Sequence, residues 1–114
     1  MSFGKEFVNK RFDFVIKGQV EHIIDDQYHD DAVIISFPRT ISGKEEIMIA
    51  FKGFVNKGQI ESIELLDLVE TDDQIFFNAC IKWSSGDILH ATEALYLVDG
   101  KVFRQFSHEQ QVDR

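Results

Sequence analysis

Apolar positions in the first half of the chain recur at the spacing of one helix face. Three stretches place them at steps of three and four residues: 2–17, 19–29 and 42–58. Between the second and the third, the apolar run Ala32–Phe37 ends at Pro38 and predicts a strand. Residues 39–42 predict a short extended link. We therefore expect three helices, with one strand after the second.

The second half of the chain has the β-rich, alternating character of strands. Four stretches show it: 59–70, 74–83, 88–98 and 101–108. Polar turns separate them, and Asp99-Gly100 is a strong signal for a tight hairpin. Helices followed by hairpin-connected strands predict an α+β fold, in which the helices pack on one face of a curved antiparallel sheet.

Length and charge limit the classes of function. The chain has 114 residues, 44% of them apolar, which suits one compact domain over residues 1–114. Lys plus Arg number 12 and Asp plus Glu number 20, so the net charge is −8 and we expect no nucleic-acid or membrane partner. A single cysteine, Cys80, and an N-terminus without a signal-peptide pattern lead us to expect a cytoplasmic protein.

Three local stretches carry a resemblance to a known superfamily: Tyr28–Val33, Ile41–Ile47 and Glu93–Val102. In this order they resemble the nuclear transport factor 2-like superfamily, which includes the ketosteroid isomerases and the SnoaL-like polyketide cyclases. The resemblance covers nearly the whole chain. It implies a cystatin-like α+β roll, with a bent sheet wrapped into a cone around a long N-terminal helix and an apolar pocket at the open end. It also implies a homodimer.

The isomerases of this group use a carboxylate base, tyrosines and a protonated carboxylic acid. The resemblance carries the base position onto Ser36, the tyrosine positions onto Phe12 and Phe51, and the acid position onto Glu93. A serine hydroxyl is a poor base unless another group activates it. The chain is therefore not expected to be a true ketosteroid isomerase, and Glu93 is the best candidate for a catalytic residue.

The strand pattern around Glu93 leaves its direction open. Leu89, Ala91, Leu95 and Leu97 share one face with Glu93, but the opposite face is also fairly apolar. The resemblance places Glu93 in the pocket. If the side chain is buried there without a partner, desolvation raises its pKa, and the neutral acid can donate a hydrogen bond to a ligand carbonyl.

Residues of the last strands complete the candidate pocket. The resemblance assigns Phe103, Gln105 and Ser107 to it; in the alternative, Arg104 and His108 face the pocket and Arg104 pairs with Glu93. Trp83 either lines the mouth of the cone or lies in a dimer contact.

A metal site is conceivable on the second helix, where acidic and histidine residues gather: His22, Asp25, Asp26, His29, Asp30 and Asp31. Because that helix needs its other face for burial, we expect this cluster to point to water, and we expect no metal and no cofactor.

Two functions remain. The first is a SnoaL-like domain that binds a small apolar molecule carrying a carbonyl or hydroxyl group, with an acid-assisted isomerase, dehydratase or cyclase as its catalytic form. The alternative is a non-enzymatic homodimeric module whose cone is filled by the 11 phenylalanines. In either case, an apolar outer sheet face predicts a homodimer. Its expected residues are Leu66, Leu68, Phe76, Tyr96 and Phe106.

Overall fold

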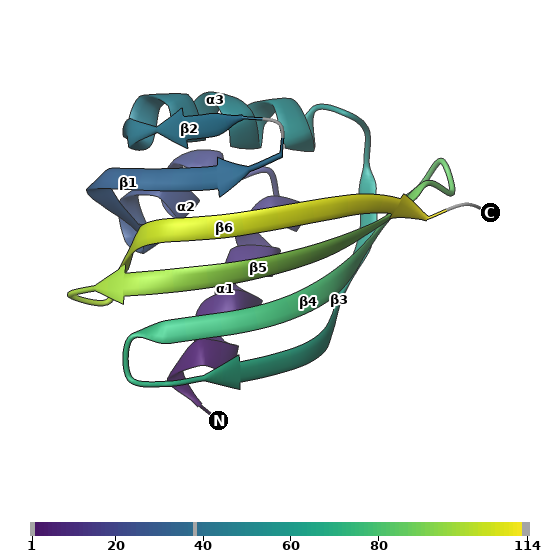
Figure 1. Cartoon of the computed structure of the whole chain (residues 1–114). Helices are drawn as coiled ribbons and strands as arrows, with labels where there is room; N and C mark the ends of the chain where they lie inside the picture. The colour runs from purple at the N-terminus through teal and green to yellow at the C-terminus, as the bar shows by residue number, and fades with distance from the viewer. Residues whose placement is uncertain (1, 38, 113–114) are drawn as a thin grey trace.

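The computed structural model describes residues 2–37 and 39–112. Its helices are α1 (Phe3–Ile16), α2 (Val20–Gln27) and α3 (Gly43–Val55), as Figure 1 shows. Its strands are β1 (Tyr28–Ser36), β2 (Thr40–Ser42), β3 (Ile60–Glu70), β4 (Gln74–Trp83), β5 (Ile88–Val98) and β6 (Lys101–Val112). The three predicted helices, the five predicted strands and their order are confirmed, and the structure has one further strand. The predicted extended link is strand β2, while β1 begins four residues earlier and β6 ends four residues later than predicted.

The six strands form one sheet in the order β2-β1-β6-β5-β4-β3. The predicted α+β class with a curved sheet is confirmed, with one correction to the pairing. β1 runs parallel to β6, whereas the other neighbouring strands are antiparallel. Hairpins force antiparallel pairing, but β1 reaches β6 through most of the chain and is free of that constraint.

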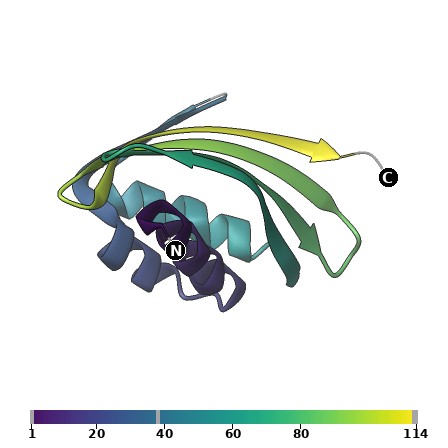
Figure 2. The ribbon, with the colours of Figure 1, turned by 90° about the horizontal axis from the view of Figure 1, so that it is seen from below.

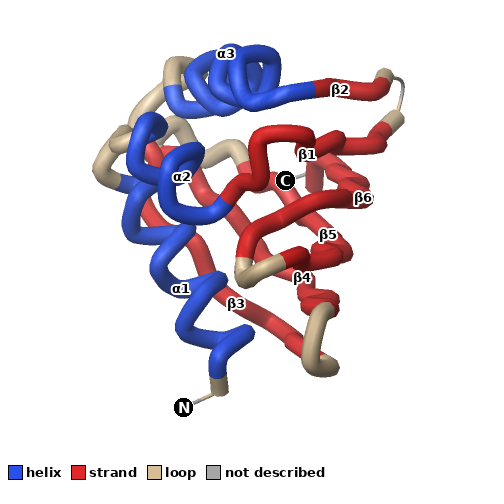
Figure 3. The backbone as a smooth tube through the Cα atoms, turned by 90° about the vertical axis from the view of Figure 1, so that its left-hand side faces the viewer, coloured by secondary structure: helices blue, strands red, loops and turns tan. Residues whose placement is uncertain are grey.

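All three helices lie on the concave face of the sheet, and the convex face is bare (Figures 2 and 3). The core fills the space between the two layers, where the fully buried residues include Val8, Ile23, Ile47, Tyr28 and Val102. Among the described residues, no helix is long and apolar enough to cross a membrane.

A carboxylate from the far edge of the sheet fixes the start of α1. Ser2 Oγ accepts from Lys5 N at 3.1 Å, and Glu70 Oε2 at the end of β3 accepts from Gly4 N at 2.9 Å. These bonds satisfy amide groups that have no partner within the helix. A Cβ at position 4 would lie 2.7 Å from the same Glu70 oxygen, so a larger residue there would require the Glu70 side chain to move.

Two β-bulges reverse the predicted inward and outward directions. In β6 the register passes from Val102 to Arg104, so Phe103 is an extra residue. Its ring packs edge-on against His29 and under Arg104, and the expectation that it lines the pocket is wrong. In β3 the extra residue is Leu66, which turns Leu68 toward the core and off the outer face where we expected it. An inserted residue has this effect because side-chain direction alternates with a period of two.

Candidate functional site

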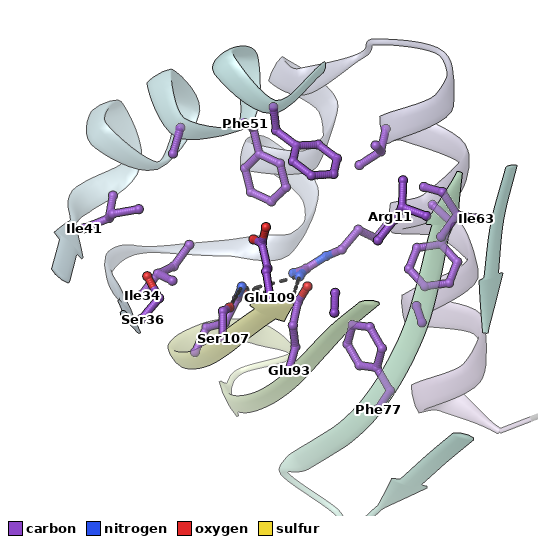
Figure 4. Close-up of a pocket in the computed structure, with 18 residues that line it drawn as sticks. Arg11, Ile34, Ser36, Ile41, Phe51, Ile63, Phe77, Glu93, Ser107 and Glu109 are labelled. Atoms are coloured by element: carbon purple, nitrogen blue, oxygen red, sulfur yellow. Dashed lines mark hydrogen bonds and ion pairs between the residues drawn. The ribbon is translucent and has the colours of Figure 1, made fainter. Parts of the chain in front are cut away.

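A cavity of about 140 Å³ lies between the helices and the concave face of the sheet (Figure 4). Its wall is largely apolar and includes the rings of Phe12, Phe51, Phe54 and Phe77. The structure brings six of the eight predicted pocket residues to this cavity: Phe12, Ser36, Phe51, Glu93, Gln105 and Ser107. The other two, Trp83 and Phe103, line separate hollows.

Arg11 is the central polar residue of the cavity, and our sequence analysis missed it. It lies on α1 four residues after Phe7 and four before Val15, on the buried stripe of the helix. Its side chain runs into the cavity, and the residue is only 3% exposed. A charged residue at the spacing of the apolar stripe was the signal that could have identified it.

Arg11 forms an ion pair with Glu93 across the cavity. Arg11 Nη1 donates to Glu93 Oε1 at 3.2 Å, and the two side chains are 4% and 18% exposed. Arg11 Nε donates to Gln27 Oε1 at 2.9 Å, which fixes the plane of the guanidinium. Arg11 Nη2, in contrast, is buried and has no hydrogen-bond partner among the described residues. Arg11, which lines the cavity, therefore has one charged donor group without a partner among those residues.

Gln105 connects Glu93 to the rest of the polar network. Its Nε2 donates to Glu93 Oε1 at 3.0 Å and to Ser107 Oγ at 2.8 Å. Its Oε1 accepts from Arg11 Nη1 at 3.4 Å and from the hydroxyl of Tyr28. Burial raises the pKa of Tyr28, so this hydroxyl stays a protonated donor. Because the Tyr28 hydroxyl is bonded to Gln105, it does not take the place of the tyrosine hydroxyls that the family's isomerases have at the positions of Phe12 and Phe51.

The partner of Glu93 corrects two expectations. The alternative in which Arg104 pairs with Glu93 is wrong, because Arg104 donates instead to the backbone carbonyls of Asp31 and Phe103. The condition that Glu93 is buried without a partner is also not met, since Arg11 occupies that role. His108 lines an outer groove beside Phe37 and does not line the inner cavity.

Burial raises the pKa of Glu93 above the ordinary value of 4.5. The Arg11 guanidinium opposes this effect, and the carboxylate of Glu109 adds to it. Desolvation therefore outweighs the attraction of the ion pair, as is common for buried pairs.

The raised pKa predicts a loss of stability with rising pH. Between the unfolded and the folded pKa the folded chain binds more protons than the unfolded chain, so the free energy of unfolding falls as pH rises. We expect the wild type to lose stability relative to Glu93→Gln as pH rises from about 4.5, the ordinary value, through the raised pKa. Urea unfolding of both proteins between about pH 4 and pH 8 measures this difference. If the wild type instead gains stability relative to Glu93→Gln over that range, Arg11 dominates and lowers the pKa of Glu93.

The acidic and histidine cluster does not converge on one point. Asp26 pairs with Lys10 and Asp30 pairs with Lys44, each at 3.0 Å. His22 stacks on Phe14. Within residues 2–37 and 39–112, no group of three or more His, Cys, Asp or Glu side chains is placed to hold a metal ion.

Trp83 lies outside the cavity, behind Phe54. The two ring centroids are 5.4 Å apart, and Trp83 is buried within the chain. The cavity instead continues into an outer groove of about 620 Å³ between α3 and the end of β6. Ser36, Ile41, Phe54, Ser107 and Glu109 are among the residues that line both spaces. The inner cavity therefore has an open side.

The sequence matches no family model and no curated protein. Solved structures, however, share the fold over most of the chain. An NTF-2 like protein of unknown function from Burkholderia xenovorans has a TM-score of 0.81 at 15% identity, over 98% of this chain and 86% of that chain. A SnoaL-like family protein from Agrobacterium tumefaciens has a TM-score of 0.80 at 11% identity, over 96% and 99%. A Sinorhizobium meliloti protein, named as a proposed polyketide cyclase, has a TM-score of 0.76 at 17% identity, over 90% and 94%.

These similarities define the class of the chain as a curved-sheet α+β cone. The fold is that of the nuclear transport factor 2-like proteins, and SnoaL-like proteins share it. The resemblance found in the sequence is thus confirmed at the level of the fold. Because this fold serves many activities, function has to be argued from the cavity and its side chains.

Proposed function

We propose that this chain binds a small apolar molecule carrying a carbonyl or hydroxyl oxygen in the inner cavity. The observation that carries the proposal is the buried, unpartnered Arg11 Nη2. A buried donor without an acceptor costs about 1–3 kcal/mol, and more when it is charged. A ligand oxygen accepting from Nη2 would remove this cost, and the phenylalanine rings would take up the apolar part of the ligand.

The size of the cavity restricts the ligand to about one ring. Typical ligand pockets enclose about 300–1,000 Å³, whereas an engineered apolar cavity of about 150 Å³ holds one benzene. The inner cavity of about 140 Å³ is close to the second value. A larger ligand would have to extend through the open side into the outer groove. The cavity argues against the completely filled cone of the alternative.

Any catalysis here would rely on Glu93. Its raised pKa suits a proton donor, and its Oε2 makes no hydrogen bond within the described part of the chain. Ser36 is not activated as a base, because its hydroxyl proton is donated to the backbone carbonyl of Arg39 at 3.2 Å and not to a side chain that could remove it. An acid-assisted isomerisation, dehydration or cyclisation of a SnoaL-like type is therefore the catalytic form that we propose.

Acetophenone, one ring with one carbonyl, is a direct probe of this proposal. We expect it to shift the amide resonances of Glu93, Gln105 and Ser107 in an NMR titration of the wild type. Arg11→Lys keeps the charge but removes Nη2, and we expect it to weaken binding about tenfold or more, the effect of one charged hydrogen bond. Arg104→Lys makes the same substitution outside the cavity and should bind like the wild type. Equal binding by Arg11→Lys would contradict the proposal.

We further propose that the chain forms a homodimer through the convex face. One apolar row crosses five neighbouring strands in register: Val69, Phe76, Ala94, Phe106 and Ile35. Val69, Phe76 and Phe106 are each more than half exposed in the single chain. A second copy offers an identical row, and a self-complementary patch suits a twofold dimer.

A further inference from the structure

Glu109 stands where the inner cavity meets the outer groove. On β6 the inward-facing series runs Gln105, Ser107, Glu109 after the bulge, and Ser107 pairs with Ser36, the last residue of β1. Glu109 is therefore the next inward-facing residue of β6 after Ser107. It lies beyond the end of β1, so β6 has no paired strand on that side at this position. It lines both spaces, and in Figure 4 its carboxylate projects from β6 toward α3 beside Glu93.

The carboxylate of Glu109 has no ion-pair partner among the residues that the structure describes. In the part of the chain that the structure describes, it makes no ion pair or hydrogen bond, yet it is close enough to raise the pKa of Glu93. The cavity therefore holds two carboxylates, Glu93 and Glu109, and one guanidinium, Arg11. Arg39, Lys57 and His108 line the outer groove but not the inner cavity. With both carboxylates ionised, the inner cavity has a net charge of −1.

The hydrogen-bonding groups left free at the cavity are of two kinds. Arg11 Nη2 is a donor that lacks an acceptor. Glu93 Oε2 and the oxygens of Glu109 are acceptors that receive no donor from the described residues. A ligand that satisfies both kinds carries an acceptor and a donor on neighbouring atoms, as a carboxamide or a hydroxy ketone does.

We propose that the cavity selects uncharged ligands whose polar end both accepts and donates hydrogen bonds, and that Glu109 is the residue that excludes carboxylates. The inference rests on the proposed binding function and names the chemical class of its ligand. A carboxylate ligand would accept from Arg11, but Glu93 already neutralises that guanidinium. The added negative charge would then lie beside Glu109 without compensation, which is unfavourable in a largely apolar cavity.

Three one-ring probes of nearly equal size test this selectivity: benzamide, acetophenone and benzoate. Benzamide offers a hydrogen-bond donor and an acceptor, acetophenone offers an acceptor alone, and benzoate carries a negative charge. At pH 7 we expect wild-type affinity to fall in that order, with benzoate about tenfold or more below benzamide, the effect expected for one like charge at short range and intermediate dielectric. Dissociation constants from NMR or calorimetric titration measure the order.

Glu109→Gln removes the charge while keeping the shape of the side chain. We expect it to tighten benzoate binding about fivefold to tenfold, and to change the affinity for uncharged acetophenone by a clearly smaller factor. Glu64→Gln is the matched control, because Glu64 is an exposed carboxylate of β3 that does not line the cavity. Both variants should keep the wild-type melting temperature, since both positions are exposed.

The possible results distinguish a failure of the proposed selectivity from a failure of the proposed ligand binding. If benzoate binds the wild type as tightly as benzamide, or if Glu109→Gln changes benzoate binding no more than Glu64→Gln does, Glu109 is not the selecting residue. In both cases the cavity still binds ligands and the proposed function stands. If none of the three probes binds the wild type, the proposed function fails, and the selectivity fails with it.

Discussion

Arg11→Met is expected to lower the free energy of unfolding by about 3–5 kcal/mol, which is the usual cost of removing one partner from a buried ion pair. Arg11 is 3% exposed and donates to Gln27, Glu93 and Gln105. Methionine preserves much of the side-chain volume but removes all of these donors. It leaves the Glu93 carboxylate with Gln105 as its remaining donor. Urea unfolding at pH 7 measures the loss.

A second substitution distinguishes the buried charge from lost packing. In the Arg11→Met background, Glu93→Gln removes the uncompensated carboxylate, so the double variant should recover about 1–3 kcal/mol relative to the sum of the two single changes. The cost of Arg11→Met should also shrink at acidic pH, because Glu93 is then protonated in both proteins. If the two losses simply add, and do so at every pH, the Arg11–Glu93 pair is not the source of the effect.

On β5 the sequence pattern grouped Leu89, Ala91, Glu93, Leu95 and Leu97 on one face, and the structure confirms that these residues share the face toward the helices. Which of the two faces points inward came from the superfamily resemblance, because both faces of the strand are fairly apolar. Arg11 was missed for a different reason. A charged residue in a helix is assigned to solvent by default, and only its partner 82 residues away shows why it is buried. The position of Arg11 on the apolar stripe is a local sign of burial, but the sequence does not show which residue it pairs with.

The bulges show a second limit of sequence patterns. Neither Phe103 nor Leu66 has a glycine beside it in the sequence that would indicate an inserted residue. One unpaired residue nevertheless turns Leu68 inward and separates Phe103 from Gln105 and Ser107. The register of neighbouring strands places these bulges, and that register depends on the curvature of the whole sheet. The strands were therefore predicted correctly, while Phe103 and Leu68 were assigned to the wrong faces of the sheet.

The double variant Phe76→Asp/Phe106→Asp is expected to weaken the proposed homodimer at least about a hundredfold, since each interface would then bury four unpaired carboxylates. Both side chains belong to the apolar row of the convex face, at 51% and 53% exposure. They do not line the inner cavity, so acetophenone binding should persist. Sedimentation equilibrium over a range of concentrations measures the dissociation constant.

Ile49→Asp provides the control for this change. Ile49 is 65% exposed on α3, in the helical layer on the other side of the sheet from the apolar row, so an aspartate there should leave the dimer intact. A wild type that sediments as a monomer at all concentrations would contradict the dimer itself. A dimer that survives the double substitution would place the interface elsewhere on the chain. Because the cavity is closed off from the convex face by the sheet, neither result would affect the argument for ligand binding through Arg11.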